Sequence, residues 1–384
     1  MGRSRGLAWG IPYSRTVPTI PTPPSPAQLS DAAANLFDKV FRGGIADLRP
    51  TPAKIIHEQA KCTVFRYIRS TDAPDRMLPV LLVPPLAAPA TCFDLRRGHS
   101  LAEHLLGLGH PTYLVDYGPI SYSDRELGLE HWVEEVIPTA VRRVSDDTGG
   151  APVQVVGWCL GGIMALLSAA GDEGLPVNSM ALVASPFDFT RVRLMAPIRP
   201  IANLTGGALL TQVYRALGGA PSPLVRRAFQ LTSIDKEITK PVAIATHLHD
   251  RDWLAHVEAV DRFMSRMYAY PGRTFGQLYH QFFRVNDLAD GHMVLSDREI
   301  DLADVRVPVL SVAGDNDVLA PQPAVHHVGD LLPNSPDVRL ERAPGGHLGV
   351  LTGRSAKRAT WRYIDEFFVQ HGAGEEPGGA RVAA

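Results

Sequence analysis

The sequence predicts an α/β protein in which a mostly parallel central sheet is flanked by helices and interrupted by an inserted, mainly helical cap. Apolar strand patterns alternate with helical patterns between about residues 78 and 184, which is typical of a parallel sheet covered on both faces. A buried strand runs directly into a glycine-rich turn around Cys159. The alternation stops between residues 189 and 300 and then resumes, which indicates an insertion.

The first part of the chain supplies an arm, a helix and two strands. Six prolines between residues 9 and 27 are too dense for a helix or a central strand, so an extended arm is expected there. An amphipathic helix is expected from Ser30 to about Phe41. The alternation over Cys62–Ile68 predicts a strand, and the apolar run Leu78–Pro85 predicts a fully buried strand of the parallel type.

The alternating units then follow in order. Helices are expected over residues 95–106, 126–145 and 162–170, and strands over residues 111–116, 153–156 and 179–184. After the insertion the sheet resumes at Val307–Ala313, and a final helix is expected over Trp361–Phe368. The predicted division is a proline-rich arm with a helix (1–50), an α/β core (51–188 and 301–371), a cap (189–300) and a disordered tail (372–384).

Composition excludes several classes of function. Thirty-eight basic and forty acidic side chains leave a net charge of −2, which gives no reason to expect nucleic acid or an anionic membrane as a partner. Cys62, Cys92 and Cys159 have no ligand-like spacing, so we expect neither a disulfide framework nor a metal site. The sequence follows its basic first residues with a proline-rich polar stretch instead of an apolar one and has no run of about 18 apolar residues, so no secretory leader is expected. It therefore predicts a soluble cytoplasmic protein without a membrane span.

The turn around Cys159 has the pattern Gly-x-Cys-x-Gly-Gly between a strand and a helix. Such an elbow needs small residues at Gly157 and Gly161, where larger side chains would collide with the neighbouring helix and strand. At the start of a helix, Cys159 would feel the positive end of the helix dipole, which favours the thiolate and leaves the N–H of Leu160 free to face an oxyanion. The alternative is that Cys159 is a small apolar filler of the core.

Chain order after such an elbow predicts an acid and then a histidine, each on a loop after a late strand. Asp317 lies in the turn that follows Val309–Ala313, with Asp315 as the competing choice, and His347 lies between glycines before the final helix. We predict His347 as a base whose tautomer a carboxylate holds. His247, His249, His326 and His327 receive no role, because no third metal ligand accompanies them.

An oxyanion site needs a second N–H donor besides Leu160, and the loop after the strand at residues 80–83 should supply it. Pro84 and Pro85 have no N–H. Leu86 or Ala87 is therefore the expected donor.

Several segments resemble a known family. They are Pro79–Leu86, Phe93–Leu95, Gly157–Gly162, Pro186–Phe189, Asn286–Leu288 and Val307–Leu310. Between about residues 51 and 368 the chain is similar to the polyhydroxyalkanoate synthase family (poly-3-hydroxyalkanoate synthases), particularly its short class, in the α/β-hydrolase superfamily. The chain departs from the usual pattern at Trp158, where the family more often has Tyr, and at Val318, where it commonly has His.

The resemblance implies an α/β-hydrolase fold and an acyltransferase that polymerises 3-hydroxyacyl-CoA thioesters into polyester. It implies Cys159 as the nucleophile that carries a covalent thioester, His347 as the base and Asp317 as its partner. No cofactor is implied, because coenzyme A enters with the substrate. The implied partners are 3-hydroxyacyl-CoA or another acyl thioester or ester, a second copy or a second synthase subunit, and a polyester granule surface.

Two other functions stay open. One is a cysteine-dependent α/β-hydrolase, either a thioesterase or an esterase similar to dienelactone hydrolases, which use the same elbow pattern in shorter chains. The other is a catalytically silent relative that binds granules or lipids. The sequence does not indicate the length of the acyl chain.

Overall fold

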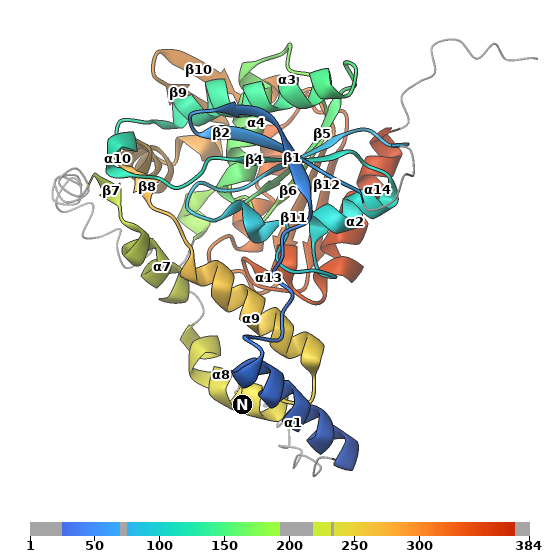
Figure 1. Cartoon of the computed structure of the whole chain (residues 1–384). Coiled ribbons are helices and arrows are strands. Elements are labelled where there is room, and N and C mark those ends of the chain that lie inside the picture. The colour runs from blue at the N-terminus through green and yellow to red at the C-terminus, as the bar shows by residue number, and fades with distance from the viewer. Residues whose placement is uncertain (1–24, 70–74, 193–217, 232–233, 373–384) are drawn as a thin grey trace, which may run out of the picture.

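A computed structural model describes residues 25–69, 75–192, 218–231 and 234–372 of the chain (Figure 1). Its centre is an eight-stranded sheet with the strand order β1-β2-β4-β3-β5-β6-β11-β12. The strands are β1 (Ala53–Gln59), β2 (Cys62–Tyr67), β3 (Val80–Val83), β4 (Thr112–Asp116), β5 (Val153–Trp158), β6 (Val177–Val183), β11 (Val309–Gly314) and β12 (Val338–Ala343). The predicted α/β-hydrolase architecture, with a mostly parallel sheet flanked by helices, is confirmed.

The sheet is antiparallel only at one edge. β2 pairs antiparallel with both β1 and β4, whereas every pairing from β4 to β12 is parallel. β1 was not predicted, because an edge strand with exposed and charged side chains such as Lys54 and Glu58 has no apolar pattern to reveal it.

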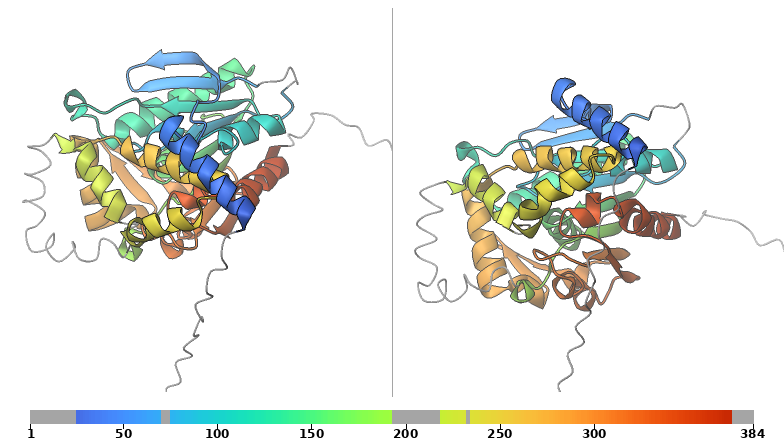
Figure 2. Two further views of the ribbon diagram at one scale, coloured as in Figure 1. Left: turned by 60° about the horizontal axis from the view of Figure 1, so that its bottom comes forward. Right: turned by 90° about the horizontal axis from the view of Figure 1, so that it is seen from below.

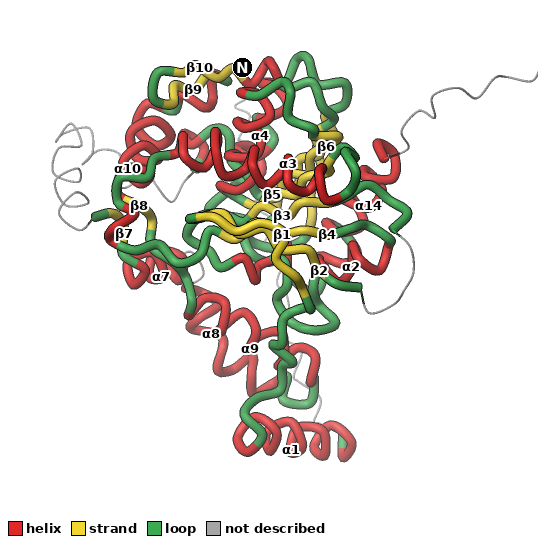
Figure 3. The backbone as a smooth tube through the Cα atoms, turned by 45° about the horizontal axis from the view of Figure 1, so that its top comes forward, coloured by secondary structure: helices red, strands yellow, loops and turns green. Residues whose placement is uncertain are grey.

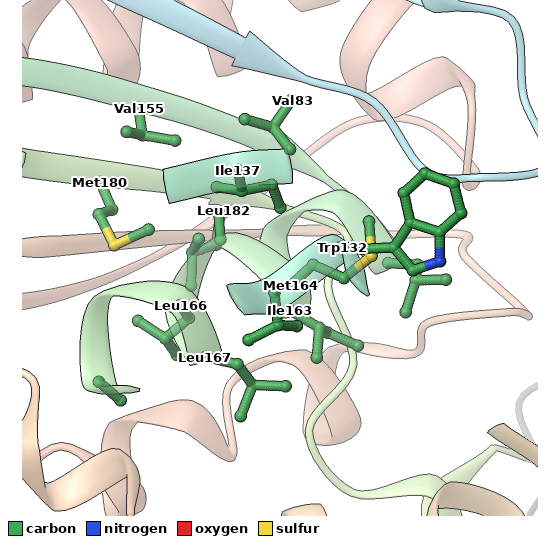
Figure 4. Close-up of a cluster of buried hydrophobic side chains, with 14 of the residues drawn as sticks. Val83, Trp132, Ile137, Val155, Ile163, Met164, Leu166, Leu167, Met180 and Leu182 are labelled. Atoms are coloured by element: carbon green, nitrogen blue, oxygen red, sulfur yellow. The ribbon is translucent and has the colours of Figure 1, made fainter. Parts of the chain in front are cut away.

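Helices cover both faces of the sheet (Figure 3). On one face lie α3 (Ile137–Asp147), which a π-helix over His131–Val136 precedes, and α4 (Leu160–Gly171). On the other face lie α2 (Leu101–Leu108) and α14 (Thr360–Gly372). Figure 4 shows the first of these cores, where apolar side chains of β3, β5 and β6 meet those of α4 and Trp132. Every residue of β5 is buried. The turn at Cys159 therefore follows directly from a strand that is packed on both faces.

Two predicted boundaries were wrong. α2 begins at Leu101 instead of residue 95, because the chain first makes a turn with a positive φ of 71° at Gly98 and Ser100 caps the helix. The arm was predicted to reach residue 27, but α1 (Pro26–Phe41) begins at Pro26, with Ser25 as its N-cap. The rest of the arm, and the predicted tail beyond Gly372, lie outside the described residues.

The predicted cap region contains α7 (Ser222–Leu231), α8 (Ile234–Thr246), α9 (Arg251–Ser265), α10 (Gly272–Gln277) and a π-helix over Leu278–Val285. It also contains a two-residue pairing of β7 (Gly219–Ala220) with β8 (Tyr270–Pro271), and a hairpin of β9 (His292–Leu295) and β10 (Arg298–Asp301). The side chains of Met293, Leu295 and Ile300 from this hairpin join the core around α4. The division of the chain into domains stays a prediction.

The N-terminal helix packs on the cap region although it is far away in sequence. α1, α8 and α9 lie together as a projection from the body of the molecule (Figure 2). Arg251 at the start of α9 forms an ion pair of 2.6 Å with Asp38 of α1, and the Asn35 amide donates a hydrogen bond of 2.8 Å to the carbonyl oxygen of Leu248.

Short elements complete the chain. They are α11 (Gln322–Val325), α12 (Val328–Leu331) and α13 (Gly349–Thr352), with 3-10 turns at Ala90–Cys92, Tyr122–Asp124, Phe189–Arg191, Asp287–Asp290, Leu302–Asp304 and Ala356–Arg358. Among the helices in the described ranges, none is both long enough and apolar enough to cross a bilayer.

Candidate active site

Cys159 lies between β5 and α4 in a strained backbone conformation. Its φ of 54° and ψ of −125° place a residue with a side chain in a region that non-glycine residues rarely adopt. The Cys159 N–H donates a hydrogen bond of 2.9 Å to the carbonyl oxygen of Val183 on β6, which fixes the turn to the sheet. α4 begins at the next residue, Leu160.

The glycines of this turn have no room for a side chain. A β-carbon on Gly157 would overlap the backbone of Gly162, and one on Gly161 would overlap the carbonyl oxygen of Val83 at the end of β3. These contacts are with backbone atoms, which cannot rotate away. The glycines therefore allow α4 to start directly beside β3 and β5.

His347 and Asp317 meet at the carboxyl edge of the sheet. Asp317 follows β11 and His347 follows β12, and the His347 Nδ1 lies 2.8 Å from the Asp317 Oδ2. The second oxygen of Asp317 accepts hydrogen bonds from the N–H groups of Leu319 at 2.9 Å and Ala320 at 2.8 Å. Both carboxylate oxygens therefore have fixed partners.

Asp315, the competing acid in the same turn, points elsewhere. It forms an ion pair with Arg342 at 2.7 Å, and about a third of its side chain is exposed. The structure thus brings Asp317, and not Asp315, to the imidazole. Val318, which departs from the family pattern, is half exposed.

Burial alone would lower the pKa of His347, but the Asp317 carboxylate and the nearby Cys159 sulfur together raise it well above its usual value. The His347 Nε2, which faces away from the bond to Asp317, is buried and has no hydrogen-bond partner among the described residues. A buried polar atom without a partner is costly, and the Cys159 sulfur is near enough to this ring to affect its pKa.

The three cysteines differ in their exposure to solvent. All are free thiols, but Cys62 and Cys92 are buried and only Cys159 is partly exposed. Burial raises the pKa of Cys62 to about 11 and that of Cys92 well above its usual value. Cys62 and Cys92 are therefore inert core thiols.

The predicted oxyanion donors follow two neighbouring strands. Leu160 follows β5 while Leu86 and Ala87 follow β3, and these two strands are neighbours with Val83 paired to Gly157. Neither Leu86 nor Ala87 donates a backbone hydrogen bond to another described residue. The Ala87 carbonyl oxygen accepts one of 2.8 Å from the N–H of Tyr268, so the cap region fixes this loop in place.

Aromatic side chains lie around the His347 imidazole and Trp158, two of them from the cap region. The Trp158 indole Nε1 donates a hydrogen bond of 3.1 Å to the His347 carbonyl oxygen. The ring of Phe229 in α7 lies 6.4 Å from the His347 ring, and that of Phe263 in α9 lies 6.2 Å from Trp158. Burial and the nearby Cys159 sulfur raise the pKa of Tyr270, so its phenol stays protonated. The sequence marked the cap as aromatic but gave no signal for which rings reach the site.

Three of the four histidines that received no predicted role, all except His249, have structural partners among the described residues. His247 stacks on Trp253 with ring centroids 4.7 Å apart, while His326 and His327 bond to the carbonyl oxygens of Glu341 at 3.0 Å and Ala289 at 2.9 Å. Within the described ranges, no three His, Cys, Asp or Glu side chains gather in a way that could hold a metal ion.

Sequence comparison finds curated relatives at low identity. The chain is 24% identical to a poly(3-hydroxyalkanoate) polymerase subunit of Haloferax mediterranei over 90% of this chain and 69% of that protein. It is 26% identical to the corresponding subunit of Allochromatium vinosum over 84% of this chain and 90% of that protein. It is 25% identical to the subunit of Synechocystis over 80% of this chain and 82% of that protein. No family model matches the chain.

Solved structures with the same fold include a thermostable carboxyl esterase from Bacillus coagulans, with a TM-score of 0.52 and 16% identity over 83% of this chain and 98% of that one. They also include an esterase from Rhodococcus sp., with a TM-score of 0.51 and 14% identity over 83% and 99%. At such identities these structures bear on the fold alone.

Proposed function

We propose that the chain is a member of the polyhydroxyalkanoate synthase family of the α/β-hydrolase superfamily, and that it transfers 3-hydroxyacyl groups from coenzyme A thioesters through Cys159 and joins them as polyester. The observation that carries the proposal is the geometry at the carboxyl edge of the sheet. A partly exposed thiol at a strained turn lies beside an imidazole that a buried carboxylate holds at 2.8 Å. This is the arrangement that nucleophilic acyl transfer requires.

In the first half-reaction, the His347 Nε2 accepts the proton of the Cys159 thiol, and the sulfur attacks the carbonyl carbon of the thioester. The negative charge that develops on the carbonyl oxygen is stabilised by the N–H of Leu160 and that of Leu86 or Ala87. The bond to the coenzyme A sulfur then breaks, and His347 returns its proton to this leaving group. Cys159 is left as a thioester.

In the second half-reaction, the hydroxyl group of another hydroxyacyl unit attacks the Cys159 thioester. His347 accepts the hydroxyl proton as the new ester bond forms, and the proton passes to the Cys159 sulfur as the carbon–sulfur bond breaks. The donor and the enzyme-bound intermediate are both thioesters of similar energy, so the acyl group is not trapped on the enzyme. The reaction therefore needs no cofactor beyond the coenzyme A of the substrate.

Transfer to a hydroxyl must compete with hydrolysis, so water has to be kept from the acylated Cys159. Phe229, Phe263 and Tyr270 from the cap region, together with Trp158, give the site an apolar surround. Such a surround also suits an apolar polyester chain.

The share of each relative's length that the chain covers supports membership in the short class of the family. The match covers 90% of the Allochromatium vinosum subunit but 44% of the Rhizobium meliloti subunit. A second synthase subunit, a second copy and a granule surface are the partners that this class implies. The exposed side chains of Leu36, Phe37, Val40 and Phe41 on α1 offer an apolar surface for such a partner.

Product analysis tests the proposal. The purified chain, alone and co-expressed with a second synthase subunit, would be incubated with 3-hydroxybutyryl-CoA. Release of coenzyme A together with insoluble polyester is the expected result. Release of free 3-hydroxybutyrate would instead identify a thioesterase. No release of coenzyme A in either preparation would contradict acyl transfer and favour a silent, granule-binding relative.

A further inference from the structure

We propose that Trp158 is a positioning residue that holds His347 against the Cys159 sulfur. The inference rests on the proposed function for its kinetic consequence, but its structural basis is independent. Trp158 is the residue directly before Cys159, its side chain is 1% exposed, and its indole N–H donates a hydrogen bond of 3.1 Å to the His347 carbonyl oxygen.

His347 is thus held at two points. Asp317 binds the imidazole through Nδ1, and Trp158 binds the backbone of the same residue. The first contact fixes the tautomer of the ring. The loop is also tied by the Asn316 N–H, which donates a hydrogen bond of 2.9 Å to the Gly345 carbonyl oxygen, but the Trp158 bond acts on the backbone of His347 itself. Together the two contacts of His347 orient Nε2, the nitrogen that has no partner among the described residues.

The bond crosses the sheet. Trp158 ends β5, His347 follows β12, and β6 and β11 lie between these two strands. Because residues 158 and 159 are joined by one peptide bond, the residue that anchors the imidazole loop also fixes the position of the sulfur. Besides the packing of the four strands, a short covalent path and one hydrogen bond thus link the sulfur to the imidazole loop directly.

The indole also contacts the cap region. The rings of Trp158 and His347 lie 5.4 Å apart, and Phe263 of α9 lies 6.2 Å from the indole. α9 is fixed to the core by ion pairs between Asp252 and Arg96 at 2.6 Å and between Asp250 and Arg354 at 3.0 Å. The anchor of His347 is therefore enclosed between the sheet and a fixed helix, where a replacement ring cannot move away.

This role requires tryptophan. A Phe or Tyr ring at position 158 fills a similar volume but has no N–H at the place of Nε1. Trp158→Phe therefore removes the donor and keeps most of the packing. Trp361→Phe is the matched control, because Trp361 is also 1% exposed and its Nε1 donates to a backbone carbonyl oxygen, that of Leu351, at 2.8 Å.

The experiment measures two quantities on the full-length chain. One is the single-turnover release of coenzyme A from 3-hydroxybutyryl-CoA. The other is the pH dependence of Cys159 alkylation by iodoacetamide, followed by mass spectrometry. For Trp158→Phe we expect release about 10-fold slower than in the wild type, because small displacements of a reacting group carry large kinetic costs. We also expect the pH of half-maximal alkylation to rise, because a displaced imidazolium stabilises the thiolate less.

Trp361→Phe should leave both quantities at wild-type values while lowering the melting temperature at least as much as Trp158→Phe. Equal kinetic losses in the two variants would show a merely structural role and overturn the inference. Unchanged release and alkylation in Trp158→Phe would also overturn it. If the wild type releases no coenzyme A, the proposed function fails, and the alkylation profile still decides the role of Trp158.

Discussion

Asp317 accepts a hydrogen bond of 2.8 Å from His347 through Oδ2 while two backbone N–H groups, at 2.8 and 2.9 Å, occupy its Oδ1. A carboxylate with both oxygens occupied cannot rotate, so it keeps the proton of His347 on Nδ1 and leaves Nε2 free to act as the base. Asp317 is also the main reason, with Cys159, that the pKa of this buried histidine is raised instead of lowered.

Asp317→Asn should therefore lower kcat/KM for coenzyme A release by about 10³- to 10⁴-fold, because the amide favours the wrong tautomer of His347. Asp315→Asn is the matched control in the same turn. It loses an ion pair with Arg342 that is partly exposed, so its activity should stay near that of the wild type. The opposite ranking of the two variants would assign the acid to Asp315.

Cys159→Ser should lower turnover at least about 100-fold, because a serine hydroxyl ionises far less readily than a thiol beside the same imidazole. Cys62→Ala is the control, since Cys62 is buried in the core and its loss affects stability instead of chemistry. The measurement is the rate of coenzyme A release at equal concentrations of folded protein. Wild-type turnover in Cys159→Ser would refute the nucleophile assignment.

Gly161→Ala should destabilise the fold by about 2 kcal/mol or more, because the new β-carbon would overlap backbone atoms of Val83 and Pro84. Gly107→Ala in α2 is the control. Nothing lies within 4 Å of a β-carbon at Gly107, so this exposed helical position should gain about 0.5–1 kcal/mol. Urea unfolding measures both changes, and tolerance of alanine at position 161 would show that α4 does not start as close to β3 as described.

The stability of the chain should fall as the pH drops below about 6.5. Burial, with the neighbouring His99 and Arg96, lowers the pKa of His256 from 6.5 to about 4. Since the unfolded chain binds this proton at a higher pH than the folded chain, the stabilisation is complete above 6.5 and is lost as the pH falls from 6.5 towards 4. The loss amounts to about 3 kcal/mol at most.

His256→Gln removes the titrating group. Comparison with the wild type therefore isolates the effect of His256 on stability from that of His347, whose raised pKa makes stability rise as the pH falls. The free energy of unfolding of the variant, measured in urea at pH 7.5, 6 and 5, should depend less on pH than that of the wild type. The charged neighbours of His256 are Arg96, Asp252 and Arg354, and they remain in place. Parallel pH curves for the two proteins would refute the burial of a neutral His256.

The central strands could be predicted because a parallel sheet buries both faces of each strand, and fully apolar runs such as Val80–Val83 leave a plain pattern in the sequence. The elbow and the order of acid and histidine could be predicted because their spacing along the chain follows from the order of the strands. The edge strand β1 has mostly exposed side chains, so it could not be separated from a loop.

The surroundings of the site could not be predicted. Trp158, Phe229, Phe263 and Tyr270 come from four different elements, and their convergence depends on how the cap region packs over the sheet. No local pattern encodes that packing. The start of α2 was misplaced for a related reason, because residues 95–100 are apolar and charged like a helix but form a turn around Gly98.

Mass spectrometry of the chain after brief mixing with 3-hydroxybutyryl-CoA shows directly whether Cys159 carries the acyl group. We expect a hydroxyacyl adduct on the peptide that contains Cys159, and no adduct in Cys159→Ala. With butyryl-CoA, a 3-deoxy substrate that has no hydroxyl to attack the thioester, we expect a butyryl adduct to accumulate on the same peptide. Coenzyme A release by a protein whose Cys159 never carries an acyl group, or an adduct confined to Cys62 or Cys92, would contradict acyl transfer through Cys159.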